Sequence, residues 1–186
     1  MKYNLPYLIN LPPFFIKDID VSDLKGVKKL SLILRGKILA FFIKILDKKI
    51  FYIFINTFFR SDGRIDFDNG KYVKSTKNGL KIYFPNKRIL RIVKNYKNNF
   101  DRIFYSYCLN EIDFNQGDVI IDCGSNIGEL KYALNQNNID SSYVAFEPDP
   151  KTFDCLNLNH SGESLHLFNY ALSNKEGSLK FFLDNE

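Results

Sequence analysis

The sequence has 186 residues, of which 45% are hydrophobic and 25% are charged. This composition excludes a fully disordered chain and fits one domain, or one domain with a helical extension. The net charge of +5 is unevenly distributed: residues 1–117 hold 22 basic and 10 acidic side chains, and residues 118–186 hold 4 and 11. The two portions therefore have opposite signs, +12 and −7, which indicates two functional zones.

Cysteine and histidine usage argues against a disulfide framework and against a zinc centre. Cys108, Cys123 and Cys155 are odd in number and far apart, which favours a reducing compartment, and we expect Cys123 and Cys155 to be buried. With two histidines and no CxxC pair, no metal site is expected. The N-terminus has no signal-peptide pattern. In the most apolar region, residues 30–59, the longest uncharged run is residues 50–59, which is too short to span a bilayer. We therefore expect a cytoplasmic protein without a transmembrane helix.

Residues 1–75 are predicted to form a basic, largely helical extension. Ser22 with Asp23 could cap a helix that begins near Leu24, and residues 24–59 have the pattern of one or two helices. One helical face is basic and another is apolar, as shown by Lys37, Lys44 and Lys48 on the first and Ile38, Phe41, Phe42 and Ile45 on the second. One interpretation is an amphipathic helix on an anionic membrane surface, which would make the protein membrane-peripheral. The interpretation we favour is that the apolar face packs on its own domain and the lysines are solvated.

Residues 61–75 are rich in turn signals, and we place the boundary to a second domain, residues 76–186, there. Residues 79–93 alternate apolar and polar side chains around Pro85, which predicts a β-hairpin, and residues 99–110 predict an amphipathic helix. A run of basic residues in this region could form a surface that binds nucleic acid. We favour the alternative that these residues lie on a solvated edge of the hairpin, and we do not expect a nucleic-acid partner. The members of this basic run are Lys87, Arg88, Arg91, Lys94 and Lys97.

The remaining segments alternate between strand and helix patterns. Strands are predicted over residues 118–123, 143–146, 165–169 and 178–183, and helices over Glu129–Gln136 and 152–159. The first strand is nearly continuously apolar, which predicts burial on both of its faces. This order predicts a parallel sheet with crossover helices, the doubly wound α/β plan.

The most informative motif follows the first of these strands. Asp122 stands at the carboxyl end of that strand, and Gly124 and Gly128 permit a sharp turn and a close approach of ligand to backbone. The helix after the turn directs unpaired N–H groups towards a ligand, and Glu147 ends the next strand, where a carboxylate can accept hydrogen bonds from ribose hydroxyls. The turn lacks the second glycine that admits a pyrophosphate, so S-adenosylmethionine fits better than a dinucleotide.

Three segments resemble the FkbM family of S-adenosylmethionine-dependent methyltransferases: GDVIIDCGSNIGEL, YVAFEPDP and FNYALSNKEGSLKFF, within about residues 117–183. The resemblance implies a class I, Rossmann-like methyltransferase fold and O-methylation of a sugar, glycan or small-metabolite hydroxyl. It also implies the residues that contact the cofactor: Asp122, Gly124, Ser125, Asn126 and Gly128 on the methionine side, Glu147 on the ribose with Pro148 and Asp149 shaping its turn, and Ala171 and Leu172 beside the adenine.

The family continues with a later acidic strand motif that this sequence does not contain. We therefore expect a sheet truncated after about four strands, with the cofactor half present and the catalytic residues unassigned. Two alternatives stay open: an RNA methyltransferase, motivated by the basic portion, and a truncated, non-catalytic chain that needs a partner.

Overall fold

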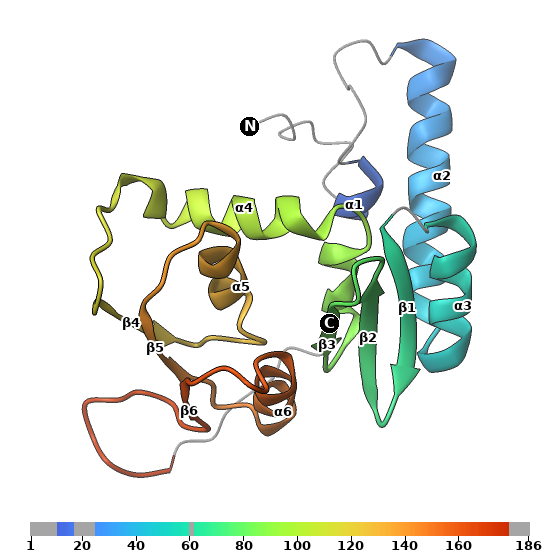
Figure 1. The fold of residues 1–186 in the computed structure, drawn as a ribbon. Coiled ribbons are helices and arrows are strands. Elements are labelled where there is room, and N and C mark those ends of the chain that lie inside the picture. The colour runs from blue at the N-terminus through green and yellow to red at the C-terminus, as the bar shows by residue number, and fades with distance from the viewer. Residues whose placement is uncertain (1–10, 17–24, 60–61, 179–186) are drawn as a thin grey trace.

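The computed structural model describes residues 11–16, 25–59 and 62–178, which form a mixed α/β structure with two three-stranded sheets. Figure 1 shows the antiparallel sheet between the N-terminal helices on one side and the parallel sheet on the other. The elements are α1 (Pro13–Ile16), α2 (Gly26–Ile45), α3 (Lys48–Phe58), β1 (Gly63–Asp68), β2 (Lys71–Thr76), β3 (Lys81–Phe84), the 3₁₀ helix η2 (Lys87–Ile92), α4 (Tyr96–Ser106), the 3₁₀ helix η3 (Leu109–Glu111), β4 (Val119–Cys123), α5 (Glu129–Gln136), β5 (Ser142–Phe146), α6 (Pro150–Asn159) and β6 (His166–Phe168).

The prediction of one or two helices over residues 24–59 is confirmed by α2 and α3. The α2 helix begins after Lys25 without a side-chain cap, and the predicted capping residues 22 and 23 lie outside the described residues. Its buried face consists of Leu32, Gly36 and Leu39, whereas the apolar face named above is largely exposed. The favoured interpretation, that Ile38, Phe41 and Ile45 pack on their own domain, is therefore wrong.

The antiparallel sheet lies where the sequence predicted turns. Strands β1 and β2 form a hairpin, and β3 pairs with the other edge of β2. Asn69 and Gly70 connect β1 to β2 with φ angles of 48° and 79°, which is the geometry that a two-residue hairpin requires. The predicted hairpin around Pro85 is wrong: β3 ends at Phe84, and the chain continues into η2, since proline has no N–H for a strand ladder.

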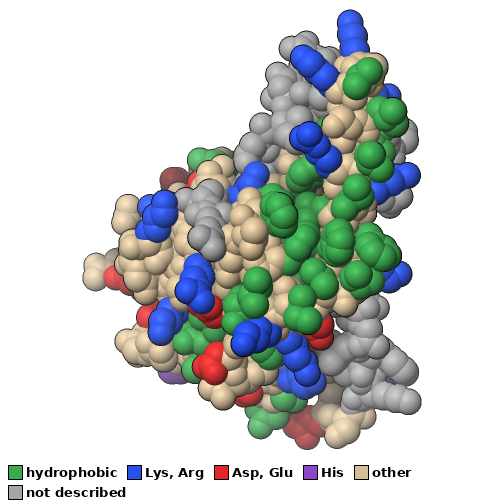
Figure 2. Space-filling view, turned by 90° about the vertical axis from the view of Figure 1, so that its right-hand side faces the viewer, with side chains coloured by type: hydrophobic (Ala, Val, Ile, Leu, Met, Phe, Trp, Pro, Cys, Tyr) green, Lys and Arg blue, Asp and Glu red, His purple; other side chains and the backbone are tan. Residues whose placement is uncertain are grey.

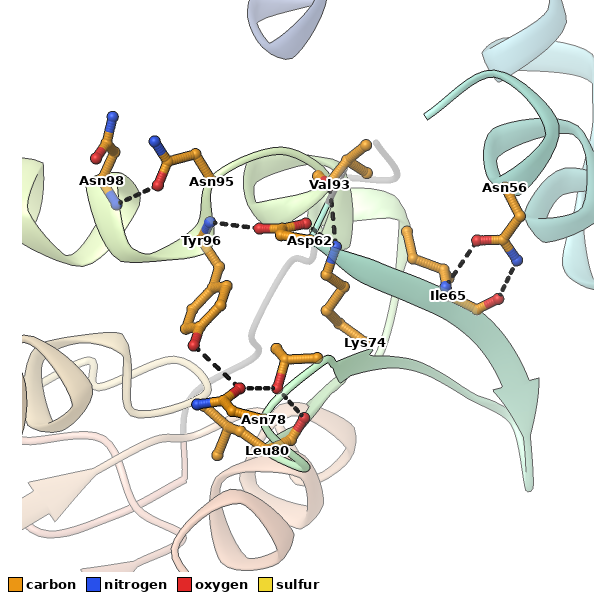
Figure 3. Close-up of polar contacts among 11 residues, drawn as sticks. Asn56, Asp62, Ile65, Lys74, Asn78, Leu80, Val93, Asn95, Tyr96 and Asn98 are labelled. Atoms are coloured by element: carbon orange, nitrogen blue, oxygen red, sulfur yellow. Dashed lines mark hydrogen bonds and ion pairs between the residues drawn. The ribbon is translucent and has the colours of Figure 1, made fainter. Parts of the chain in front are cut away.

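A buried polar network holds β2 to the junction between η2 and α4 (Figure 3). The Lys74 ammonium is buried; it donates to Asp62 Oδ1 at 2.5 Å and to the Val93 carbonyl at 2.9 Å. Asp62 Oδ2 in turn accepts the backbone N–H of Tyr96 at 3.1 Å, at the start of α4. An ammonium this deeply buried requires such partners, so these bonds fix the entry of α4.

The parallel sheet has the order β4-β5-β6, with α5 and α6 as crossovers. The predicted strands and helices of residues 118–169 are confirmed, and α5 has the bounds predicted for it. The prediction of a strand over residues 178–183 falls, apart from Ser178, outside the described residues. In this part of the structure the chain has the β-α-β-α-β order that the sequence predicted.

One face of the parallel sheet is packed and the other is open. Leu134 and Leu156, from α5 and α6, pack on Tyr143 and Ala145 of β5. On the opposite face Val119 and Ile121 are 59% and 60% exposed, because no described helix covers that side. The prediction that β4 is buried on both faces is therefore wrong. Cys123 is exposed on β4 as well, contrary to prediction, whereas Cys155 is buried as predicted.

Asn159, at the end of α6, joins the two sheets. Its side chain accepts the N–H of Tyr83 at 2.7 Å and donates to the Tyr83 carbonyl at 3.1 Å, as a neighbouring strand would. It also donates to the carbonyl of Ile127 at 2.9 Å, in the loop before α5. One amide side chain thereby fixes β3 against the loop that follows β4.

None of the helices in the described part of the chain combines the length and apolar composition that a bilayer-spanning segment needs.

Candidate functional site

The loop between β4 and α5 lies at the carboxyl edge of the parallel sheet. Gly124 and Gly128 have φ angles of 82° and 83°, and Asn126 between them has 52°, so the turn runs through left-handed conformations that glycine adopts without strain. The N–H groups of Gly124 and Ser125 both donate to the carbonyl of Phe146, at 2.8 and 3.0 Å. The loop is thereby attached to the end of the neighbouring strand, β5.

Glu147, the residue after β5, ties the ends of three strands together. Its Oε2 accepts the N–H of Asn126 at 2.9 Å, and its Oε1 accepts the N–H of Asp149 at 2.9 Å. Its carbonyl accepts the side-chain amide of Asn169, after β6, at 2.7 Å. The glycine loop and the acidic strand end therefore meet at one edge of the sheet, and each carboxylate oxygen keeps acceptor capacity for a further hydrogen bond.

A pocket of about 420 Å³ lies between this loop and the α4 helix. Its volume falls within the range of small-molecule sites, and its position at the carboxyl ends of parallel strands is the usual one for ligands of α/β proteins. It is lined by Arg91, Asn99, Arg102, Ile103, Ser106, Tyr107, Asp122, Gly124, Ser125, Asn126, Glu129 and Leu130. Four of the predicted cofactor residues, Asp122, Gly124, Ser125 and Asn126, are brought together there.

Gly128 does not line the pocket; close packing explains why glycine stands there. A Cβ at this position would overlap the imidazole of His160 and lie 2.9 Å from Leu156 Cδ1. His160 is buried between Glu163, whose Oε1 lies 2.9 Å from Nδ1, and the Gly128 carbonyl, 3.2 Å from Nε2. Gly128 therefore lets the start of α5 approach the end of α6.

The other predicted site residues also lie outside this pocket. Asp149 caps α6: its carboxylate accepts the N–H of Thr152 at 2.9 Å and the Thr152 hydroxyl at 2.6 Å. Pro148 lies half-buried between this cap and Glu147. Ala171 and Leu172 are exposed in the segment that follows β6.

Asp122, at the carboxyl end of β4, is a titratable group that precedes the loop. Burial raises the pKa of its carboxyl group, against the opposing effect of a short hydrogen bond donated by the Tyr143 hydroxyl. Burial and the neighbouring Asp122 charge raise the pKa of Tyr143, which keeps this phenol protonated as a donor. An ionised carboxylate in such a position favours a ligand with a positive charge or with hydrogen-bond donors.

The residues that α4 and η2 contribute to the pocket were not predicted from the sequence. Glu129 is buried beneath them; it accepts the Asn99 amide at 3.1 Å and lies 3.6 Å from the Arg91 guanidinium. Burial raises the pKa of Glu129, and Arg91 and Arg102 act in the opposite direction. The amphipathic pattern of residues 99–110 predicted a packed helix, but no local signal showed that it would pack beside the glycine loop.

The basic run is partly used in packing. Lys87 donates to the Ile43 carbonyl at 3.0 Å and lies over the Phe51 ring, and Lys94 lies over the Phe59 ring. The segment is 3₁₀ and α-helical, so the predicted hairpin edge is wrong. These contacts connect η2 and the segment after it to the N-terminal helices.

No family model, no curated protein and no solved structure matches this chain. Its function is therefore inferred from the motifs and from the geometry of the pocket.

Proposed function

We propose that this chain binds S-adenosylmethionine and is a methyltransferase acting on a hydroxyl group of a sugar, glycan or small metabolite. In this proposal the parallel sheet is part of a class I, Rossmann-like methyltransferase sheet of the doubly wound type. The observation that carries the proposal is the hydrogen bond from the Asn126 N–H to Glu147. It joins the glycine-containing loop to the acidic strand end, the two features from which an adenosyl ligand was inferred.

The chemistry of the pocket, together with that of the buried Glu147 beside it, supports a ligand with both an amino-acid end and a hydroxyl-bearing end. Asp122 is suited to a cationic group, whereas the guanidinium groups of Arg91 and Arg102 are suited to a carboxylate. Glu147, one hydrogen bond away from the pocket-lining Asn126, has the acceptor capacity for ribose hydroxyls. The loop has no glycine where a pyrophosphate would approach, which disfavours a dinucleotide.

S-adenosylmethionine supplies an electrophilic methyl group on a sulfonium centre. The contribution of the chain is then to orient the reactants, since holding an acceptor oxygen in line with that methyl group removes much of the entropic barrier. Asp122 and Glu147 would hold the two ends of the ligand, and α4 would form the wall facing them. No residue is assigned as a general base.

Equilibrium binding tests this proposal. Titration calorimetry with S-adenosylmethionine and S-adenosylhomocysteine should detect binding to the full chain, and both Glu147→Gln and Asp122→Asn should weaken it by about tenfold or more, since each removes a charge-assisted contact. Asp140→Asn is the matched control, because Asp140 is an exposed carboxylate outside the pocket. Absence of binding by the folded chain would refute the proposal.

The acceptor is tested separately, with methyl-labelled cofactor and fractions of small metabolites, glycans and RNA. Label in a sugar or metabolite hydroxyl is the expected result. Label in RNA would favour the RNA methyltransferase alternative. No incorporation by a chain that binds the cofactor would favour a non-catalytic chain that needs a partner.

A further inference from the structure

The α2 helix carries an exposed apolar stripe opposite its buried face. The six side chains of the stripe recur every three or four residues and are between 48% and 84% exposed: Val27, Leu30, Leu34, Ile38, Phe41 and Ile45. At 3.6 residues per turn this spacing places all six on one face. Leu32, Gly36 and Leu39 are buried on the other side, where a Cβ at Gly36 would clash with Leu11. The stripe therefore lies on the face of α2 opposite the one that packs on the rest of the described structure.

Basic side chains border the stripe on both sides. Lys37 and Lys44, seven residues apart, lie along one margin, and Lys28 and Arg35, also seven apart, lie along the other. The α2 helix contains no acidic residue, and all four of these side chains are exposed. Among the described residues, none of the four has an ion-pair partner. The margins therefore present positive charge that no carboxylate of the described residues pairs with.

The α3 helix extends this surface. Ile50, Ile53 and Phe58 are exposed on it, and the rings of Phe42 and Phe54 lie 5.3 Å apart between the two helices. Figure 2 shows hydrophobic side chains gathered over this side of the molecule, with lysines and arginines around them. We call the stripe, its basic margins and the exposed apolar residues of α3 the α2–α3 surface. Such a large exposed apolar area on a folded chain marks an interaction site.

We propose that the α2–α3 surface docks on an anionic lipid bilayer, with α2 lying in the plane of the interface. An apolar stripe with lysines and arginines along its margins has the pattern of an interfacial helix, which inserts its apolar side among the acyl chains and binds anionic headgroups with its basic side chains. At 20 residues α2 is about 30 Å long, enough to lie across several headgroups. A second copy of the chain fits this surface less well, because the basic margins of two copies would face each other.

Docking in this orientation leaves the pocket open. In Figure 1, α2 and α3 lie on one side of the antiparallel sheet, and α5 and the parallel sheet lie on the other. The proposal does not rest on the function proposed above, because it uses none of the pocket residues.

Vesicle flotation of the full chain tests the docking. The chain should float with phosphatidylcholine vesicles that contain phosphatidylglycerol, float at least tenfold less with phosphatidylcholine alone, and be released as salt screens the headgroups. Leu34→Ser with Phe41→Ser, and separately Lys37→Glu with Lys44→Glu, should each abolish flotation. The matched controls change exposed residues elsewhere and should float as the parent does: Ile112→Ser with Leu158→Ser, and Lys151→Glu with Lys175→Glu.

A fluorescence experiment reports directly which surface enters the bilayer. Since the chain has no tryptophan, Phe41→Trp introduces a single probe into the stripe, and Tyr170→Trp introduces one at an exposed position far from it in sequence. Anionic vesicles should shift the emission of the first probe to the blue and leave the second unchanged. Far-UV circular dichroism verifies that each variant is folded.

Three results would overturn the proposal: no flotation by the parent chain, equal flotation with neutral vesicles, or equal shifts of both probes. A parent chain that does not float but forms a dimer, which the Leu34→Ser and Phe41→Ser changes convert to a monomer, would assign the surface to a second copy.

Discussion

Replacement of Gly128 by alanine tests whether close packing determines this position. Gly128 has φ 83° and ψ 30° and precedes α5, and an added Cβ would overlap His160. Gly124 provides the matched comparison, because its φ is 82° but no atom lies within 4 Å of an added Cβ. The two substitutions impose the same unfavourable φ angle on alanine. They differ in the space available to the added Cβ.

The structure sets the expected magnitudes. A left-handed backbone costs alanine about 1–2 kcal/mol, which applies to both positions. At Gly128 the imidazole of His160 must also move, which disturbs its contacts with Glu163 and with the Gly128 carbonyl. Overpacking of this kind adds about 1–3 kcal/mol. We therefore expect the free energy of unfolding to fall by about 1–2 kcal/mol for Gly124→Ala and by about 2–5 kcal/mol for Gly128→Ala.

Urea denaturation followed by far-UV circular dichroism measures both losses. Adding His160→Ala to Gly128→Ala should cost less than the two single substitutions together, because the smaller side chain leaves room for the new Cβ. Equal losses for Gly124→Ala and Gly128→Ala would refute the packing explanation.

Three further substitutions test other contacts. Asn159→Ala deprives the backbone of Tyr83 of its side-chain partners, and we expect the free energy of unfolding to fall by about 2–4 kcal/mol in urea; a loss as small as that of a surface substitution would show that the amide does not join the sheets. Lys74→Ala leaves Asp62 without its ammonium partner and should cost about 3 kcal/mol in the same assay, and an unchanged midpoint would contradict the network of Figure 3. Asp122→Asn should raise the stability of the ligand-free chain at neutral pH. Burial raises the pKa of Asp122 above 3.8, so the stability linked to its protonation is present in acid and lost as pH rises through the folded-state pKa. The advantage of the variant should disappear on acidification towards pH 3.8, and a pH-independent difference would argue against this cause.

The parts of the fold that sequence predicted best are those in which local pattern and tertiary environment agree. The helix predicted after the glycine turn has the bounds of α5, and the apolar segment predicted as the next strand forms β5, on which Leu134 of α5 packs. The meeting of the glycine loop with Glu147 could also be predicted, because the carboxyl ends of neighbouring parallel strands share one edge.

The failures concern features that local pattern does not determine. Residues 61–75 were predicted to be rich in turns but not to form a hairpin, because the two strands that flank Asn69-Gly70 are rich in charged residues. Before Pro85 the alternation belongs to strand β3, but after it the apolar spacing belongs to a 3₁₀ helix, whose buried residues Ile89 and Ile92 lie three positions apart.

Burial also depends on what lies opposite an element. An apolar strand such as β4 has the same sequence pattern whether one or both of its faces are covered, so the exposure of Val119 and Ile121 was not predictable. The same holds for the pocket: α4 contributes Asn99 and Arg102 to it only through its packing beside α5.

Hydrogen–deuterium exchange of the full chain, with and without saturating S-adenosylmethionine, shows whether the glycine loop and Glu147 bind the cofactor. Because the proposed site joins the glycine loop to Glu147, the cofactor should slow exchange in peptides that contain residues 122–130 and 146–149, and leave α2 unchanged. Glu147→Gln should abolish this protection. Unchanged exchange at both segments, or protection confined to other parts of the chain, would contradict the assignment of the pocket as a cofactor site.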